Sequence, residues 1–144
     1  MASNNTLQTA LLYVDDIIIT GTNPRVISKL VTTLDSKFAV KDLGQLHYFL
    51  EVQLHTVLDG VLLKQEKYVK DLLHHLDLGD LKPAPSPSVL NNQLSISDGT
   101  PLDNPYIYRS TIGALQYLTT TRLDITYAVN HLSQYLKKPT DVHW

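Results

Sequence analysis

The sequence predicts an α+β fold in which short strands come first and helices come last. Apolar and β-branched runs separated by turn residues recur in the first half of the chain, whereas apolar residues at steps of three and four dominate the second half. A stretch rich in Pro and Ser, residues 81–104, precedes the last two predicted helices. This order favours an α+β body with a small helical bundle over an alternating parallel sheet.

Length and composition limit the class of protein. The 144 residues suffice for one domain or two small packed ones, and 43% hydrophobic residues provide material for a core. The absence of Cys excludes disulfides, thiolate zinc sites and a cysteine nucleophile. A formal net charge of −2 argues against tight nonspecific binding of nucleic acid by this chain alone. Because no apolar run could span a membrane and the start lacks a secretory signal, we expect an intracellular protein with no membrane partner.

The first element is predicted to be a β-hairpin. Residues 9–14 and 17–20 are runs of aliphatic, β-branched and aromatic side chains that flank Asp15 and Asp16. We expect both strands to be buried and the two aspartates to form the turn.

A helix is predicted from about Pro24 to Lys37. Segment 21–24 supplies a turn, an N-cap candidate and a Pro at the first helical position. Apolar residues at helical spacing form one stripe: Val26, Ile27, Leu30, Val31, Leu34 and Phe38. This apolar face should cover the hairpin.

A second hairpin is predicted after this helix. Residues 46–54 and 61–64 are typical of strands, and Asp59 with Gly60 is the turn signal between them.

A second helix is expected over residues 65–76, which carry an apolar stripe, and Gly79 is its expected end signal. The Pro residues of 81–104 forbid a long helix or a central strand, so that segment is predicted to be a loop. Two further helices follow. The first covers residues 106–121, and the second has Asp124 as its N-cap and an apolar stripe over 125–136.

The segment Tyr13-Val14-Asp15-Asp16 is the strongest candidate for chemistry. Adjacent carboxylates repel, so their placement at a rigid turn is costly unless a cation or hydrogen bonds compensate. Mg²⁺ uses one or two carboxylates and completes its octahedron with water and substrate phosphates. The alternative for these residues is a plain hairpin turn, where Asp is common.

Other patterns carry weaker signals. His74 and His75 point about 100° apart on a helix, so they cannot chelate one metal as an i,i+4 pair does, and we expect solvated side chains. The eight Tyr residues include candidates for base stacking, but we expect most of them to pack against the core.

Residues 12–21, Leu-Tyr-Val-Asp-Asp-Ile-Ile-Ile-Thr-Gly, resemble the catalytic hairpin of reverse transcriptases from copia-type long-terminal-repeat retrotransposons. The likeness continues in order and at similar spacing from about residue 7 to the end. It includes Lys41-Asp42-Leu43-Gly44, Tyr48-Phe49-Leu50, Lys67-Tyr68-Val69, Tyr108-Arg109, Gly113, Tyr117-Leu118-Thr119, Arg122, Asp124-Ile125, Tyr127-Ala128-Val129 and His143-Trp144.

The resemblance implies part of a right-hand polymerase. Residues 7–64 would be the second half of the palm, with two β-hairpins and a helix. Residues 65–144, with the Pro-rich loop 81–104, would be a small helical thumb. Residues 46–64 are similar to a primer-grip hairpin. The residues at the grip itself would be Phe49, Leu50 and Glu51.

The same resemblance implies template-directed nucleotide addition by two metal ions, Mg²⁺ or Mn²⁺. Asp15 would be a catalytic metal ligand and Asp16 a second, less direct one. Tyr13 and Val14 would lie near the primer end and the incoming nucleotide. The implied partners are an RNA or DNA template-primer and a deoxynucleoside triphosphate.

Departures from the family pattern limit these expectations. The family also needs fingers and an upstream catalytic aspartate, yet none of the residues before Tyr13 is acidic. Glu51 stands where the family usually has Gly, which places a negative charge where a phosphate backbone would pass, and Leu123 stands where it usually has Pro. We therefore expect metal binding by this chain alone to be weak or absent, and polymerisation by it to fail.

Two hypotheses stay open. The first is the palm-and-thumb portion of a truncated retroelement reverse transcriptase that needs an upstream polymerase half. The second is a non-catalytic module, derived from a retroelement, that binds nucleic acid or protein. Loss of the fingers predicts self-association through uncovered palm surface. The compartment is open between the cytoplasm, the nucleus and, for a plant organelle genome, the mitochondrion.

Overall fold

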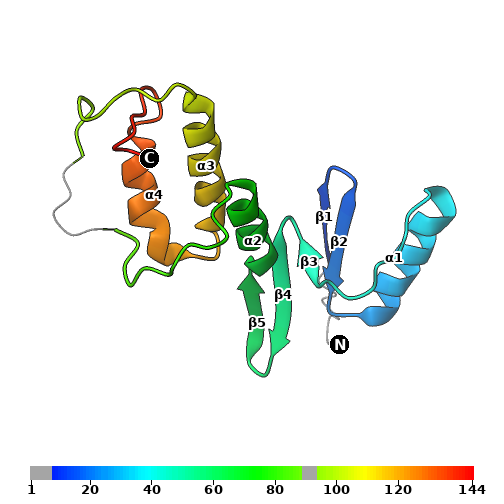
Figure 1. Ribbon diagram of the computed structural model, residues 1–144. Helices are drawn as coiled ribbons and strands as arrows, with labels where there is room; N and C mark the ends of the chain where they lie inside the picture. Colours follow the sequence, from blue (N-terminus) through cyan, green and yellow to red (C-terminus); the bar gives the residue numbers. More distant parts are fainter. Residues whose placement is uncertain (1–7, 89–93) are drawn as a thin grey trace. The chain divides into compact units, whose positions relative to one another are not determined.

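The computed structural model describes residues 8–88 and 94–144. Residues 1–7 and 89–93, which include the start of the expected palm portion and part of the Pro-rich loop, lie outside the described residues. The chain divides into two compact units, Met1–His47 and Tyr48–Trp144. Each unit contains both strands and helices, which follow one another along the chain in the order labelled in Figure 1.

The first unit contains an antiparallel hairpin of β1 (Gln8–Tyr13) and β2 (Asp16–Gly21). The two residues between the strands are Val14 and Asp15. The turn therefore lies one residue earlier than the predicted Asp15-Asp16 turn, because Asp16 pairs with Tyr13 and so belongs to β2.

The prediction that both strands are buried is wrong. Every residue of β1 is exposed, and Leu12 keeps 69% of its surface accessible. The reason is that β1 and β2 form a two-stranded sheet, which has two faces and few covering elements. Only the helix α1 contacts it among the described elements of this unit, and it does so through β2.

The helix α1 spans Pro24–Lys37, as predicted. The Asn23 side-chain oxygen accepts a hydrogen bond from the Arg25 backbone N–H at 3.1 Å, which satisfies one of the free donors of the first turn. The predicted stripe is half-buried from Val26 to Leu34, whereas Phe38 lies beyond the helix and is largely exposed. No residue of α1 is fully buried.

The second unit begins with a three-stranded antiparallel sheet in the order β3 (Tyr48–Phe49), β4 (Val52–Val57), β5 (Gly60–Lys64). The single strand expected over 46–54 is thus two strands. Leu50 and Glu51 form a tight turn between them, with φ angles of 47° and 59°. Two left-handed residues in sequence reverse the chain direction, and no Gly or Pro in the sequence marks this turn.

The helix α2 spans Glu66–His75 and ends without help from Gly79. Asp77 adopts the left-handed conformation, with φ 57°. The Leu78 N–H donates to the Leu73 carbonyl at 2.8 Å, and the Asp77 N–H donates to the His74 carbonyl at 3.1 Å. This pattern is a Schellman cap in which Asp takes the position usually held by Gly.

The last helices are α3 (Pro105–Leu118) and α4 (Thr126–Ser133), with a short 3₁₀ turn, η1 (Leu123–Ile125), before α4. Asn104 caps α3 through a bond from the Tyr106 N–H at 3.1 Å. Asp124 lies inside η1 and is not the N-cap of α4, so that prediction is wrong.

The core of the second unit lies between α3 and α4. It consists of four buried residues: Tyr108, Ile112, Val129 and Tyr135. The Tyr108 hydroxyl donates to the Leu132 carbonyl at 2.8 Å, which satisfies the one polar atom of that ring. None of the helices in the described ranges has the length and apolar character that crossing a bilayer requires.

Candidate functional site

The four residues singled out by the sequence occupy consecutive places around one turn of the first unit. Tyr13 ends β1, Val14 and Asp15 form the turn, and Asp16 begins β2 opposite Tyr13. The two carboxylates are therefore adjacent in sequence but are held by different local structure. Asp15 is carried by a turn and Asp16 by a strand ladder.

The turn is strained at Val14, whose φ is 49°. A β-branched residue rarely adopts the left-handed region, because its Cβ substituents crowd the neighbouring backbone. The favoured two-residue hairpin turns have positive φ at the first turn residue, which is the position that Val14 occupies between β1 and β2. Such strain concentrates at functional sites, and here it lies directly beside Asp15.

The carboxylates are accessible to solvent. Asp15 and Asp16 are both exposed, and Val14 keeps 77% of its surface accessible. Two oxygen donors of this kind fit the hard-cation preference of Mg²⁺, which commonly takes one or two protein carboxylates. In the part of the chain that the structure describes, no group of three or more His, Asp or Glu side chains could hold a metal. The donor set therefore suits a partial site.

The residues expected at the primer grip lie in the second unit. Phe49 ends β3, and Leu50 and Glu51 form the strained turn that leads into β4. Phe49 and Glu51 are half-buried and Leu50 is partly exposed. This places all three on one short hairpin.

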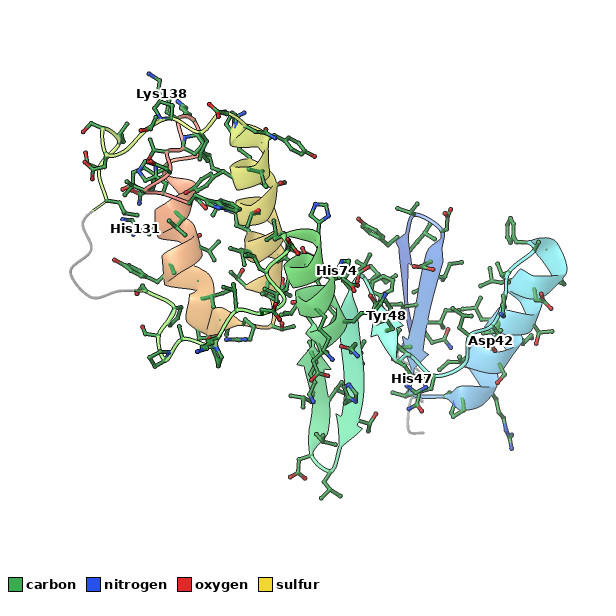
Figure 2. All side chains as sticks on the ribbon, viewed as in Figure 1. Asp42, His47, Tyr48, His74, His131 and Lys138 are labelled. Atoms are coloured by element: carbon green, nitrogen blue, oxygen red, sulfur yellow. The ribbon has the colours of Figure 1, made fainter. Side chains whose placement is uncertain are left out.

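Glu51 is not a free negative charge at this turn. Its carboxylate accepts a hydrogen bond from the Tyr48 hydroxyl. That bond, with smaller contributions from burial and from the Glu51 charge, raises the pKa of Tyr48 to about 12. The Lys67 ammonium lies 5.7 Å from the centroid of the Tyr48 ring, within the range of a cation–π contact. Figure 2 marks Tyr48 at the start of this sheet.

Sequence reasoning missed Tyr117 of α3. Its hydroxyl donates to the Leu50 carbonyl in the strained turn, across 67 residues of sequence. Its ring meets Tyr68 edge-on with 5.4 Å between centroids, and the Tyr68 hydroxyl donates to the Ala114 carbonyl at 3.2 Å. Burial raises the pKa of Tyr68. The available signal was the position of Tyr117 off the face of α3 that carries the buried residues Tyr108, Ile112 and Leu118.

A groove of about 290 Å³ lies where β5, α2 and the end of α3 meet. Gln65 lines it and is 4% exposed. Its side-chain oxygen accepts a hydrogen bond from the Thr121 hydroxyl at 2.8 Å. Its side-chain nitrogen is buried and has no partner among the described residues. This amide therefore links the start of α2 to the segment after α3 while keeping one donor unused.

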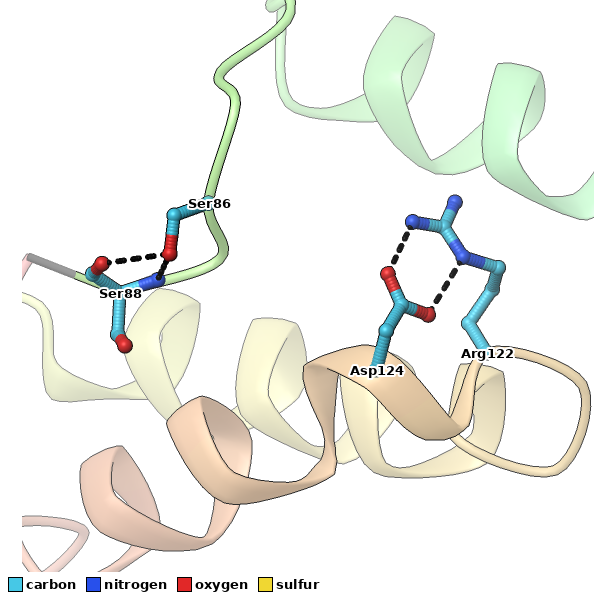
Figure 3. A network of polar contacts seen from close by, with 4 residues as sticks. All are labelled: Ser86, Ser88, Arg122 and Asp124. Carbon is cyan, nitrogen blue, oxygen red and sulfur yellow. Dashed lines mark hydrogen bonds and ion pairs between the residues drawn. The ribbon is translucent and has the colours of Figure 1, made fainter.

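Arg122 and Asp124 form a two-bond ion pair, with distances of 2.8 and 2.7 Å (Figure 3). The Arg122 guanidinium, by hydrogen bonding first and by charge second, lowers the pKa of Asp124. Both side chains are about half exposed. The pair spans the position of Leu123.

In the same view Ser86 and Ser88 bond to one another within the loop, at 2.9 Å between the Ser86 hydroxyl and the Ser88 carbonyl.

The weaker candidates give mixed results. His74 and His75 are exposed on α2, which confirms the prediction of solvated side chains. The prediction that most of the tyrosines pack against the core is wrong. Tyr108 and Tyr135 are buried in the core, whereas five of the eight are exposed: Tyr13, Tyr48, Tyr106, Tyr117 and Tyr127.

Comparison with known proteins gives one consistent result. Residues 2–90 match the family described as reverse transcriptase (RNA-dependent DNA polymerase). A retrovirus-related Pol polyprotein from transposon RE1 of Arabidopsis thaliana is 44% identical over 133 residues, 92% of this chain and 9% of that protein. The corresponding polyprotein from transposon RE2 is 42% identical over 134 residues, 93% of this chain and 9% of that protein.

A third relative is shorter. An uncharacterized mitochondrial protein of Arabidopsis thaliana is 45% identical over 130 residues, which are 90% of this chain and 54% of that protein. The chain thus spans about a tenth of the two polyproteins and about half of the mitochondrial protein. No solved structure matches this chain.

Proposed function

This chain belongs to the reverse transcriptase (RNA-dependent DNA polymerase) family, and from that premise we propose that its β1–β2 hairpin is the catalytic hairpin of a polymerase palm. The predicted resemblance to a retrotransposon reverse transcriptase is confirmed by the family match and by the two transposon polyproteins. The α+β class is confirmed as well. The palm and thumb assignments, and the division between residues 7–64 and 65–144, are part of the proposal.

One observation carries the proposal: the Tyr-Val-Asp-Asp segment lies at the tip of a two-residue hairpin, with Asp15 in the turn and Asp16 on β2. This geometry presents two sets of carboxylate oxygens to solvent, those of Asp16 from a paired strand and those of Asp15 from the turn that the pairing closes. In the proposed function Asp15 and Asp16 bind Mg²⁺ or Mn²⁺. When bound, such ions stabilise the attacking 3′ oxygen and the leaving pyrophosphate of nucleotide addition.

The remaining roles follow from position. Tyr13 and Val14 would lie beside the primer end and the incoming deoxynucleoside triphosphate. The turn formed by Leu50 and Glu51, with Phe49 behind it, would contact the primer strand of an RNA or DNA template-primer. Because the described residues hold no third carboxylate near Asp15, we infer that activity needs an upstream palm-and-fingers half.

The test is primer extension on an RNA template with Mg²⁺ or Mn²⁺. The chain is assayed alone and with a separately supplied upstream half. We expect extension only in the complemented reaction, and its loss with Asp15→Asn. A matched control is Asp59→Asn, because Asp59 is also the second residue of a two-residue hairpin turn, between β4 and β5. Equal activity of the Asp15→Asn and wild-type chains would overturn the catalytic role.

A second candidate is a non-catalytic binding module. The observation in its favour is the exposed apolar surface of β1, where Leu11 and Leu12 are more than half accessible. Such a module would bind nucleic acid or protein without regard to Asp15. Binding that survives Asp15→Asn, together with a complemented reaction that fails for the wild-type chain, would favour this alternative.

A further inference from the structure

The turn between β3 and β4 is held in an unfavourable backbone conformation. Leu50 and Glu51 both have positive φ, at 47° and 59°. A pair of left-handed residues is the geometry of the tightest hairpin turn, which usually recruits Asn or Gly because a Cβ crowds the backbone there. Neither residue is of that kind. The strand β3 that precedes the turn has two residues, so its ladder alone offers little to enforce this shape.

Two tyrosine hydroxyls add hydrogen bonds to this turn beyond those of the strand ladder. The Tyr48 hydroxyl donates to the Glu51 carboxylate from within the same hairpin. The Tyr117 hydroxyl donates to the Leu50 carbonyl from α3. A strained backbone conformation persists when several surrounding contacts hold it in place, and these two hydrogen bonds are such contacts. Only the second of them crosses to another element.

Tyr117 is itself well placed to act as an anchor. Its ring packs edge-on against Tyr68 of α2, at 5.4 Å between centroids. Tyr68 in turn donates to the Ala114 carbonyl of α3. The hydroxyl of Tyr117 is therefore carried by a ring that two helices fix, and it reaches the turn from a stable support.

We propose that Tyr117 is a positioning residue that ties the Leu50–Glu51 turn to α3, so that this turn and α3 move together. The consequence for primer contact rests on the proposed function, in which this turn touches the primer strand. Without the hydroxyl the turn relaxes and moves independently of α3. The primer would then be held less firmly, whereas the carboxylates of the β1–β2 hairpin would be unaffected.

The first test uses amide hydrogen exchange in the full chain and needs no activity. Tyr117→Phe removes only the hydroxyl. Tyr106→Phe is the control, because Tyr106 lies on the same helix and is 73% exposed. We expect Tyr117→Phe to speed exchange over residues 48–53 by up to about tenfold, the range set by one hydrogen bond. Exchange in α4 should be unchanged. Equal protection of 48–53 in both variants, or a uniform rise across the chain, would overturn the tether.

The second test measures primer extension with the upstream half present. We expect Tyr117→Phe to raise KM for template-primer severalfold, up to about tenfold, at nearly unchanged kcat. Tyr106→Phe should match the wild type. A fall in kcat at constant KM contradicts a positioning role. If the wild-type chain shows no extension, the proposed function fails, and the exchange experiment decides the tether by itself.

Discussion

Tyr13 and Asp16 face one another directly across the β1–β2 ladder, with only Val14 and Asp15 between them. This pairing makes the two neighbouring carboxylates structurally different. Asp16 is fixed by strand pairing, whereas the position of Asp15 depends on the conformation of a two-residue turn. The strain at Val14 therefore acts on the carboxylate to which we assign the leading metal-binding role.

Replacing Val14 with Gly should stabilise the hairpin. Glycine removes a left-handed penalty of about 1–2 kcal/mol and adds about 0.5–1 kcal/mol of chain entropy to the unfolded state. We expect a net gain of up to about 1.5 kcal/mol in hairpin protection, measured by amide exchange in β1 and β2. Val57→Gly is the control. Val57 is also next to a two-residue turn, the one between β4 and β5, but its own φ is not positive, so Gly relieves no strain there. Equal losses of protection in the two variants would contradict the strain argument.

Replacing Leu12 with Lys should weaken self-association. Leu12 is 69% exposed on β1, so a charge there interrupts an apolar surface without entering a core. We expect the wild-type chain to show concentration-dependent sedimentation and Leu12→Lys to sediment more slowly at the same concentration. Leu58→Lys is the matched control, because Leu58 is fully exposed at the tip of the β4–β5 hairpin. A wild-type chain that is monomeric at all concentrations would refute the prediction.

The hydroxyl of Tyr48 should titrate late. Its bond to Glu51 holds the proton and raises the pKa to about 12 from the ordinary 10.0. Because the folded-state pKa is the higher one, the associated stabilisation is fully present below pH 10 and is lost as pH rises through 12. Subtracting the ultraviolet titration of Tyr48→Phe from that of the wild type isolates this group. We expect Glu51→Gln to return the pKa of Tyr48 toward 10.0. An unchanged pKa of Tyr48 in Glu51→Gln would disprove that the bond to Glu51 raises it.

The bond between Gln65 and Thr121 should be worth measurable stability. Gln65 is 4% exposed, so Thr121→Val leaves a buried amide with no partner among the described residues, at a cost of about 1–3 kcal/mol. Gln65→Leu removes the amide itself. A double-mutant cycle in urea should give a coupling energy of about 1 kcal/mol. Thr120→Val is the control, since Thr120 is an exposed neighbour. Additive effects of the two substitutions would contradict a direct bond.

Helix positions were predictable because their signals are local. Asn23 with Pro24 marks the start of α1, and the equivalent Asn104 with Pro105 starts α3. Each Asn side chain accepts a bond from a backbone N–H two residues later, which needs no distant partner. The resemblance to reverse transcriptases also rests on short runs of residues, and the family match confirms membership of that family.

The wrong predictions concern a turn between strands and the capping of two helices. Nothing in the residues 46–54 marks the turn at Leu50 and Glu51, because both are poor left-handed residues. The helix α2 ends at a Schellman cap with Asp77 in the left-handed position, two residues before Gly79. Asp124 has a side chain suited to an N-cap, but its carboxylate accepts hydrogen bonds from Arg122 instead of from the first turn of α4. Each of these outcomes depends on which partner a residue finds, and spacing alone does not contain that information.

The sequence by itself determined the family, the helices and the pair of adjacent carboxylates, because these depend on residue identity and short-range periodicity. The tertiary structure decided burial and linkage. It left all of β1 exposed and buried only part of β2, since among the described elements α1 is the main neighbour of this two-stranded sheet and too little covers it. It also joined Tyr117 to Leu50 across 67 residues. Contacts at that separation arise from packing of whole elements, which no local pattern encodes.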